Sequence, residues 1–207
     1  GYLRYPTIVP VRSTYEPTKK DYRFSAKDNT FKLDYTKSVT NLSMDAERIK
    51  LIVDITEAAA NAGRQVLVLT SRVKSAQVIS NKIKDRHIPS SAMTGNTDGW
   101  IRDIVLKKFR NYEISVLVAT QLADEGLDLP NIDCIVSGSP AKHHARVLQR
   151  VGRALRLAGK DPIIFDLVDK AEFERQFRHR ERAYTKEYGK VVKPFHTKEE
   201  AIKLIKS

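Results

Sequence analysis

The octapeptide Gln149–Arg156, "QRVGRALR", carries three arginines spaced three residues apart. On a helix, Arg150, Arg153 and Arg156 share one face, and like charges at this spacing destabilise it by roughly 0.2–0.5 kcal/mol per pair. Gly152 lowers helix stability by roughly another 0.8–1 kcal/mol relative to alanine. Such local conflicts are typical of functional sites. We therefore expect the guanidinium groups to meet an anionic ligand.

Phosphate is the anion that these side chains suit best. Arg153 and Arg156 offer planar, permanently charged donors that match phosphate oxygens, and Gly152 lets a ligand or another backbone approach closely. The alternative is internal pairing with acids of the same domain, but three arginines paired only internally would be a costly arrangement. The acids in question are Asp124, Glu125 and Asp128.

Several catalytic devices are absent from the sequence. It contains no GxxxxGK[ST] loop to cradle nucleotide phosphates, no HExxH, no GxSxG and no paired cysteines at metal-ligand spacing. His143 and His144 are adjacent, so on a helix their side chains diverge and a surface role is favoured over metal ligation. The sequence therefore predicts no metal site and no complete active site within this chain.

The chain is strongly basic, with 37 Lys and Arg residues against 25 Asp and Glu residues and a formal net charge of +12. This surplus indicates a polyanionic partner, with nucleic acid as the first candidate; a basic surface that serves only solubility is the alternative. No apolar run reaches the roughly 18–20 residues of a membrane span. We expect an intracellular protein without a membrane partner, located in the cytoplasm, the nucleus or a virus-infected cell, and a piece of a longer protein.

Helical and strand patterns alternate from Ser43 onwards. Ser43 is the expected N-cap of an amphipathic helix that ends at Gly63. Further helices are predicted for "SAQVISNKIKDRH", "TDGWIRDIVLKKFRNYE" and residues 145–157. The runs typical of buried strands are "QVLVLTS", "IPSSAMTG", "ISVLVAT", "NIDCIVSGS" and "PIIFDLVD". Cys134, the single cysteine, lies in one of these runs and is expected to pack as a small hydrophobe.

This alternation predicts an α/β fold with a mainly parallel sheet covered by helices on both faces. In such sheets, ligands gather at the carboxyl ends of the strands. Polar clusters follow three of the predicted strands, namely Thr70–Arg72, Thr94–Asn96 and the stretch "TQLADEGLDLP". We expect these clusters to meet at one edge of the sheet.

The two ends of the chain differ from this central part. Residues 1–41 are interpreted as a peripheral arm, in which "TIVPVRSTY" is a candidate edge strand because its prolines suit an edge. Near the other end, Thr197 and Glu200 form a capping box that opens a last helix. Before it lies an aromatic stripe, for which packing against the main domain is favoured over base stacking. Its members are Phe173, Phe177, Arg180, Tyr184 and Tyr188.

Four stretches in order resemble the superfamily 2 helicases and translocases. "QRVGRALR" resembles their motif VI, "VLVATQLADEGLDLP" motif V and "VLVLTSRVKSAQVISNKI" motif IV, while "MTGNTDGWIRDIVLKKFRNYEISVLVAT" has the family's spacing between its TG element and motif V. The wording "EGLDLP" is closest to phage and viral repair or branch-migration helicases and to Rad25-like and restriction-enzyme translocases. The resemblance covers residues 65–169, about half of the chain.

The resemblance implies a RecA-like three-layer domain, the second of two lobes. It divides the chain into an arm from a preceding lobe at 1–41, the C-terminal RecA-like domain at 42–170 and a helical extension at 171–207. In this family, ATP binds between two lobes, and Mg²⁺ is held by the first lobe, whose P-loop and acidic motif are absent from this sequence. The chain alone is expected to hydrolyse hardly any ATP.

The same resemblance assigns roles near the nucleotide. Arg153 and Arg156 match the arginine fingers, which stabilise charge on the transferring phosphoryl group. Gln149 matches the position that orders the γ-phosphate and the attacking water, and Gly126 and Asp128 match motif V positions near the ribose and the fingers. For Arg150, a salt bridge and a phosphate contact remain equal alternatives.

Motifs IV and V also line the nucleic-acid path in this family. Thr120 matches a threonine that touches a backbone phosphate. Ser71, Arg72, Thr94 and Gly95 occupy positions that meet phosphates, although capping of strand ends is an alternative for the first three. The expected function is thus the second lobe of an ATP-dependent helicase or translocase, with DNA preferred to RNA. The alternative is a non-catalytic module that binds nucleic acid or a protein. For Trp100, a core or surface anchor is favoured over base stacking.

Overall fold

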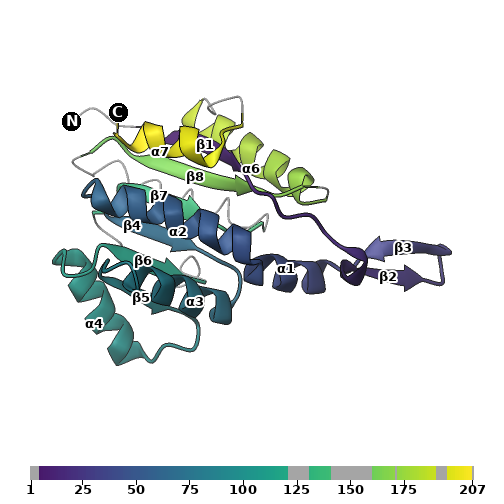
Figure 1. Ribbon diagram of the computed structural model, residues 1–207, viewed down its shortest axis with the longest axis horizontal. Coiled ribbons are helices and arrows are strands. Elements are labelled where there is room, and N and C mark those ends of the chain that lie inside the picture. The colour runs from purple at the N-terminus through teal and green to yellow at the C-terminus, as the bar shows by residue number, and fades with distance from the viewer. Residues whose placement is uncertain (1–4, 121–130, 141–159, 171, 190–194, 207) are drawn as a thin grey trace.

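In the described part of the chain, the central sheet has six strands, and every pair of neighbours in it is parallel (Figure 1). The computed structural model describes residues 5–120, 131–140, 160–170, 172–189 and 195–206. The strand order is β1-β8-β7-β4-β6-β5, which confirms the predicted α/β class with its parallel sheet. The strands are β1 (Thr7–Arg12), β4 (Val66–Leu69), β5 (Ser90–Met93), β6 (Val116–Ala119), β7 (Cys134–Ser137) and β8 (Ile163–Val168).

Apolar side chains fill both faces of this sheet. Every residue of β4, β6 and β7 is buried, as expected for strands covered on two sides. Along β4, Leu67 belongs to one hydrophobic cluster and Val68 to the other, because successive side chains point to opposite faces. Cys134 is fully buried in the second cluster, which confirms its predicted packing, and burial raises the pKa of its thiol.

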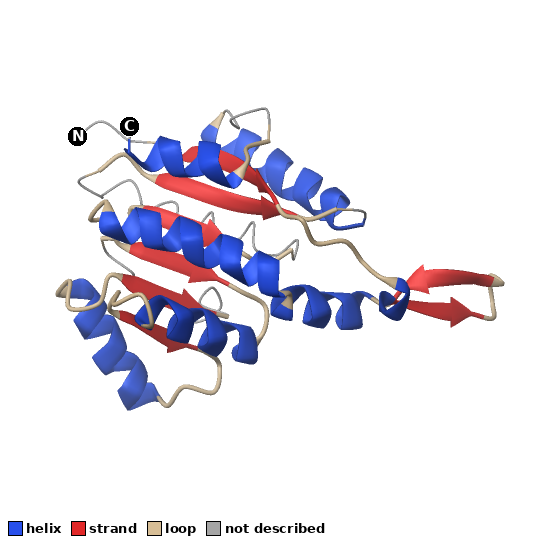
Figure 2. Cartoon of the chain, in the orientation of Figure 1, coloured by secondary structure: helices blue, strands red, loops and turns tan. Residues whose placement is uncertain are grey.

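Helices cover the two faces and make three layers (Figure 2). The helices α2 (Ala46–Asn61), α3 (Val73–Lys84) and α7 (Lys198–Lys206) contribute side chains to the cluster that contains Val68. On the opposite face, α4 (Gly99–Arg110) and α6 (Glu172–Tyr188) contribute to the cluster that contains Leu67. The predicted amphipathic helices that lie in the described part of the chain therefore each cover a face of the sheet.

The prediction that Ser43 caps a helix is wrong. Ser43 lies inside α1 (Tyr35–Met44), where its hydroxyl donates to the carbonyl of Val39 over 2.6 Å. Asp45 is the N-cap of α2, and its carboxylate accepts from the backbone N–H of Arg48 over 2.8 Å. Aspartate caps a helix as well as serine does, so the sequence left both positions open. The predicted stop is confirmed, since Gly63 follows α2 with a φ of +70°.

The predicted edge strand at "TIVPVR" is confirmed as β1, at one end of the sheet beside β8. The backbone of His196 runs along its outer side, where His196 N–H donates to Pro10 and Arg12 N–H donates to His196. Pro10 has no N–H of its own, so an edge is the position it tolerates best.

An arm follows β1 and projects from the main body (Figure 1). It comprises a 3-10 turn η1 (Lys19–Asp21), an antiparallel hairpin of β2 (Tyr22–Ser25) and β3 (Thr30–Leu33), and α1. Its base is fixed at Asp21, whose carboxylate accepts from Thr18 N–H over 2.7 Å and from the Asn41 side chain over 2.8 Å. These hydrogen bonds lower the pKa of Asp21 even though its burial opposes the shift.

The C-terminal elements pack on the main domain as predicted. All five members of the α6 stripe are buried. The capping box is also confirmed, because Thr197 N–H donates to the Glu200 carboxylate over 2.8 Å and Glu200 N–H donates to the Thr197 hydroxyl over 3.3 Å. None of the helices in the described part of the chain combines the length and apolar character needed to cross a bilayer.

Candidate functional site

Three adjacent strands bring the predicted backbone-binding residues to one edge of the sheet. Ser71 and Arg72 follow β4, Thr120 follows β6, and Thr94 and Gly95 follow β5. The order β4-β6-β5 makes these strands neighbours, with the last residues of β4 and β5 both in register with the last residue of β6. The expectation that the polar clusters meet at the carboxyl edge therefore holds for all five residues.

Backbone hydrogen bonds continue the ladder beyond the strands. The N–H of Thr70 donates to Ala119 over 2.9 Å, and the N–H of Thr120 donates to Met93 over 3.3 Å. The first residues after β4 and β6 are thus held by the same backbone pairing that holds the strands themselves. Both threonines are buried, at 1% and 8% exposed, so only a ligand brought close to this edge would reach them.

Capping of strand ends accounts for part of the predicted site. Thr94 N–H donates to the Thr97 hydroxyl over 2.9 Å, and the Thr94 hydroxyl accepts from Asn96 N–H over 3.3 Å. These bonds close a turn before α4. At Gly95, by contrast, an added Cβ would meet no atom within 4 Å, so this turn leaves its backbone open to a ligand.

Arg72 binds the arm. Its guanidinium donates to the Thr40 hydroxyl over 3.1 Å and to the carbonyls of Thr36 and Ser71, each over 3.2 Å. Thr36 and Thr40 lie on α1, so Arg72 connects the arm to the carboxyl edge. The structure thus gives this residue a positioning contact in addition to the phosphate contact expected from the sequence.

The loop after β7 belongs to the same edge and was not predicted. The hydroxyls of Ser139 and Ser71 lie 2.5 Å apart, and Gly138 N–H donates to Leu69 over 2.8 Å. A side chain at Gly138 would come within 2.8 Å of Ile52 Cδ1 and 3.1 Å of the Leu69 carbonyl oxygen. Glycine is therefore required for the loop to pass this closely between β4 and α2.

A buried arginine holds Gly138 from α2. Arg48, 2% exposed, donates to both carboxylate oxygens of Asp169 over 2.7 and 3.0 Å, and to the Gly138 carbonyl over 2.8 Å. Asp169 directly follows β8. Because the pair is bidentate and Nη2 of Arg48 also donates to the loop carbonyl, the buried charges are stabilised by geometry as well as by attraction.

A second buried arginine holds the next part of the loop from α6. Arg180 donates to both oxygens of Asp166, each over 2.9 Å, and to the Pro140 carbonyl over 2.8 Å. The attraction of Asp166 raises the pKa of Arg180 although its burial acts in the opposite direction. Tyr184 donates to Asp166 over 2.7 Å, and its burial, followed by that negative charge, raises the pKa of its phenol.

Signals for these two pairs were present in the sequence. Asp166 interrupts the otherwise apolar run "PIIFDLVD", and Arg180 lies on the aromatic stripe of α6, where a buried cation requires a partner. The sequence supplied no means of pairing them, since α6 contributes to a face of the sheet only through the tertiary fold.

Five of the ten predicted site residues lie outside the described part of the chain, as do Arg150 and the helix predicted at residues 145–157. The five site residues are Gln149, Arg153 and Arg156 of the arginine run, and Gly126 and Asp128 of the acidic turn. The sequence positions that precede them are described: Thr120 comes directly before residues 121–130, and Pro140 directly before residues 141–159. Both Thr120 and Pro140 lie at the carboxyl edge of the sheet.

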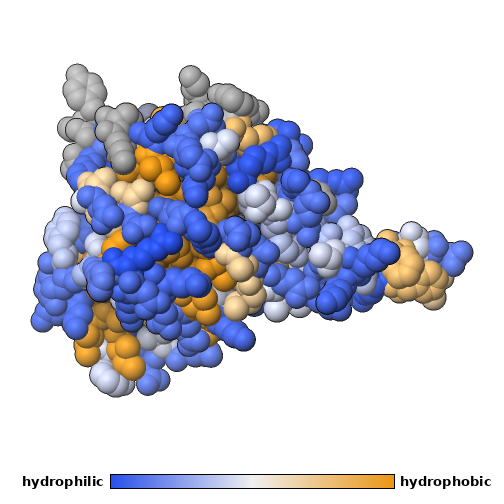
Figure 3. Space-filling view, in the orientation of Figure 1, coloured by the Kyte–Doolittle hydropathy of each residue, from blue (hydrophilic) through white to orange (hydrophobic). Residues whose placement is uncertain are grey.

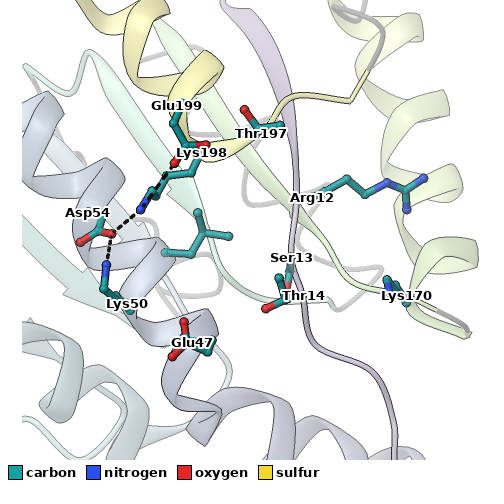
Figure 4. A pocket seen from close by; sticks show the side chains of 11 residues that line it. Arg12, Ser13, Thr14, Glu47, Lys50, Asp54, Lys170, Thr197, Lys198 and Glu199 are labelled. Carbon is teal, nitrogen blue, oxygen red and sulfur yellow. Dashed lines mark hydrogen bonds and ion pairs between the residues drawn. The ribbon is translucent and has the colours of Figure 1, made fainter.

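A groove between β1, α2 and α7 offers a different environment. It has a volume of about 490 Å³, and its lining includes Lys50, Asp54 and Lys198 (Figure 4). Lys50 and Lys198 contact the Asp54 carboxylate over 2.8 and 3.2 Å. Since these cations already have an acidic partner, we do not assign the groove as an anion site.

Metal ligands do not gather within the described ranges, where no group of three or more His, Cys, Asp or Glu side chains could hold an ion. Trp100, at the start of α4, is 66% exposed and is therefore not a core anchor.

Comparison with known proteins adds a family match. The family described as "Helicase conserved C-terminal domain" matches residues 47–158, more than half of the chain. This range includes the strand-end residues and the arginine run.

Individual relatives are similar over different shares of the chain. A putative ATP-dependent helicase of Saccharomyces cerevisiae, IRC3, is 38% identical over 81 residues, which are 39% of this chain and 12% of the relative. A putative ATP-dependent RNA helicase of Acanthamoeba polyphaga mimivirus is 25% identical over 193 residues, 90% of this chain and 36% of the relative. The chain thus spans about a third or less of these relatives.

A solved structure shows the same fold over nearly the whole chain. The crystal structure of T4 UvsW aligns with a TM-score of 0.67 at 19% sequence identity, covering 94% of this chain and 42% of that one. The shared architecture therefore includes the flanking elements as well as the sheet.

Proposed function

Because this chain belongs to the helicase conserved C-terminal domain family, we propose that it is the second RecA-like lobe of an ATP-dependent helicase or translocase. The observation that carries the proposal is the coincidence of two features. The family match contains the arginine run, and the residues expected to meet a nucleic-acid backbone lie at one edge of three adjacent strands. The intact protein would then step along a nucleic-acid backbone while hydrolysing ATP.

The carboxyl edge of the sheet is the proposed contact with the backbone. Thr120, Ser71, Thr94 and Gly95 offer hydroxyl and backbone N–H groups there, and Arg72 adds a positive charge. Such contacts do not depend on base sequence and weaken as salt concentration rises. The formal net charge of +12 supports this assignment.

Arg153 and Arg156 are the proposed arginine fingers, with Gln149, Gly126 and Asp128 beside them at the nucleotide. ATP with Mg²⁺ supplies the phosphoryl group whose transfer drives movement, and the first lobe would hold the metal. The chain's own contribution is positive charge and hydrogen-bond donors directed at the phosphates. The two arginine-held loop residues, Gly138 and Pro140, support this proposal because they provide a rigid point before the segment that carries the fingers.

DNA is the proposed track, on the resemblance of "EGLDLP" to the DNA-repair and translocase branch of the family. The mimivirus relative, in contrast, is named as an RNA helicase. Both polymers therefore belong in the functional assay.

The test is nucleic-acid-stimulated ATP hydrolysis by the longest natural protein that contains this chain, assayed with single-stranded DNA and with RNA. Arg153→Ala and Arg156→Ala are expected to reduce kcat by about 100-fold or more while nucleic-acid binding is retained. Arg175→Ala is the matched control, because Arg175 is 81% exposed on α6 and should leave kcat unchanged.

The competing function is a helicase-like module that binds nucleic acid or a protein without catalysis. Unchanged turnover in both arginine variants, or a natural protein that lacks an upstream P-loop lobe, would favour that module. Greater stimulation of ATP hydrolysis by RNA than by DNA would reject DNA as the bound polymer but not the helicase assignment.

A further inference from the structure

The β2–β3 hairpin has one aromatic face and one basic face. Its register pairs Phe24 with Phe31 and Arg23 with Lys32. Because side chains alternate along a strand, the two phenylalanines point to one side of the hairpin and the two cations to the other. The phenylalanine rings meet edge to face, with centroids 5.5 Å apart.

The aromatic face of the hairpin is left exposed by the folding of the described chain. Phe24 is 55% exposed and Phe31 69% exposed, and together they form a hydrophobic patch on the tip of the arm (Figure 3). On the other face, like charges directly opposite each other destabilise a strand pair. A two-stranded hairpin is at best marginally stable by itself, so both features point to a ligand.

The base of the hairpin is held firmly in place. Asp21 N–H and Asp34 N–H donate to Thr18 and Asp21 backbone carbonyls over 2.9 and 2.7 Å, and the Asp21 side chain links Thr18 to Asn41. Arg72 then ties α1 to the end of β4. The exposed tip is therefore carried on a rigid support anchored at the carboxyl edge of the sheet.

The hairpin also projects from that edge. The arrowheads of the sheet strands in Figure 1 point toward the side on which the arm lies. A polymer that continues from Thr120 and Ser71 in this direction would reach the hairpin. The groove beside α2 and α7 is not on this path, because it lies on a helix-covered face of the sheet. The arm is thus placed to extend the contact surface of the sheet.

We propose that the hairpin Tyr22–Leu33 is a binding site for single-stranded nucleic acid. Exposed bases stack on Phe24 and Phe31, and the backbone phosphates pair with Arg23 and Lys32 as the strand passes round the hairpin. This inference rests on the proposed function, since it extends the path of the same polymer beyond the sheet.

The chemistry of the two faces selects this ligand. Every base has a flat π face that stacks on an aromatic ring without regard to sequence, and each nucleotide also carries a phosphate. Residues 19–33 contain five basic side chains against two acidic ones, and one of those acids, Asp21, is already buried in the support. The other, Asp28, contacts Lys32, a contact that a phosphate would replace.

The first experiment tests stacking by fluorescence anisotropy with a labelled single-stranded 20-mer and the full-length protein without nucleotide. The double variant Phe24→Leu/Phe31→Leu keeps an apolar cross-strand pair but removes the rings, and should weaken binding about 10-fold or more. Tyr112→Leu is the matched control, because Tyr112 is 67% exposed beyond the end of α4, at the opposite edge of the sheet, and should leave affinity unchanged.

The second experiment tests the basic face through the salt dependence of the same affinity. Arg23→Ala/Lys32→Ala should lower the slope of log K against log salt by about 1–2, as expected for the loss of two phosphate contacts. Lys82→Ala/Lys84→Ala, two exposed cations in the last turn of α3, should leave the slope unchanged. Thermal unfolding of each variant checks that the hairpin substitutions leave the main domain folded.

The outcomes separate this inference from the proposed function. If the wild-type protein binds the 20-mer and both hairpin variants bind it equally well, the hairpin site is rejected and the helicase assignment stands. If the wild type fails to bind at all, the proposed function fails with it. A shift from dimer to monomer in sedimentation, or loss of binding to anionic phospholipid vesicles, with unchanged oligonucleotide affinity, would assign the hairpin to another partner and overturn the inference.

Discussion

At the carboxyl edge of the sheet, Asp166 and Asp169 each accept two hydrogen bonds from a buried arginine, whereas at the amino edge no arginine among the described residues pairs with Asp133 in this way. The Oδ1 atom of Asp133 is buried without a hydrogen bond among the described residues, and the nearest Arg64 nitrogen lies 4.0 Å away. Burial raises the pKa of Asp133 to about 6, although the charges of Arg64 and Lys160 oppose the shift.

The difference shows how a buried charge can be tolerated. At the carboxyl edge, each arginine satisfies a carboxylate and also binds a loop carbonyl, so the pairs hold Gly138 and Pro140 in place. At the amino edge, the Asp133 carboxylate has a backbone hydrogen bond from Gln65 and the Arg64 guanidinium 4.0 Å away, in place of a bidentate arginine. Complete pairing therefore coincides with the edge at which the candidate site lies.

The strongest test of this comparison removes a cation from the carboxyl edge. Arg180→Met leaves the Asp166 charge buried and unpaired, so the free energy of unfolding should fall by about 3–5 kcal/mol in urea denaturation. Replacing Asp166 as well, in Arg180→Met/Asp166→Leu, should recover much of the loss because no charge remains buried. If the double variant were no more stable than the single one, loss of packing and not the unpaired charge would be responsible.

At the amino edge, by contrast, removing a charge is expected to increase the free energy of unfolding. Asp133→Asn removes the charge of a buried carboxylate, so it should increase the free energy of unfolding at pH 7.5 by about 1–3 kcal/mol. The raised pKa means that the folded protein binds the proton more tightly than the unfolded chain. The destabilisation caused by the Asp133 charge is therefore absent below about pH 4, where the carboxyl group is protonated in both the folded and the unfolded chain. It develops as the pH rises through about 6. Urea denaturation at pH 4 and pH 7.5 measures both limits, and a gain of equal size at the two pH values would contradict this account.

The smallest effect is expected in the solvated groove, where pairs are partly exposed. Burial opposes ionisation of Asp54, but hydrogen bonds from Lys50, Arg86 and Lys198 lower the pKa of its carboxyl to about 2. Asp54→Asn should cost about 0.5–1 kcal/mol at pH 7, less at high salt. The difference from wild type should vanish as the pH falls from about 4 to 2, because the ionised form is lost there. If Asp54→Asn lowered the free energy of unfolding as much as Arg180→Met does, the proposed difference between buried and solvated ion pairs would be wrong.

Much of the fold could be read from local patterns. The runs "QVLVLTS", "ISVLVAT" and "PIIFDLVD" predicted buried parallel strands, and the capping box at Thr197 predicted the start of α7. The start of α2 was misplaced because two good capping residues, Ser43 and Asp45, lie two positions apart. Local chemistry alone cannot choose between them, since the choice depends on where α1 ends.

The candidate site, like the fold, could be predicted from the sequence only in part. The sequence could predict that Ser71, Thr94 and Thr120 follow strands, and that strands of this kind end at a common edge. It could not predict that Ser139 lies beside Ser71, because the order of β7 and β4 in the sheet is a property of the whole fold. The hairpin faces were also missed, since the polar and aromatic residues of this segment show no firm period until the two strands are paired.

The sequence by itself determined the strands of the central sheet, the basic character of the chain and the presence of an arginine run that suits phosphate. These properties depend on neighbours along the chain, on side-chain periodicity and on charge. Only the tertiary structure decided that Arg48 and Arg180 hold the loop after β7, and that an arm with two exposed phenylalanines projects from the carboxyl edge. Arg48 contacts a residue 121 positions away and Arg180 one 40 positions away. Contacts of that kind exist only after the layers have packed.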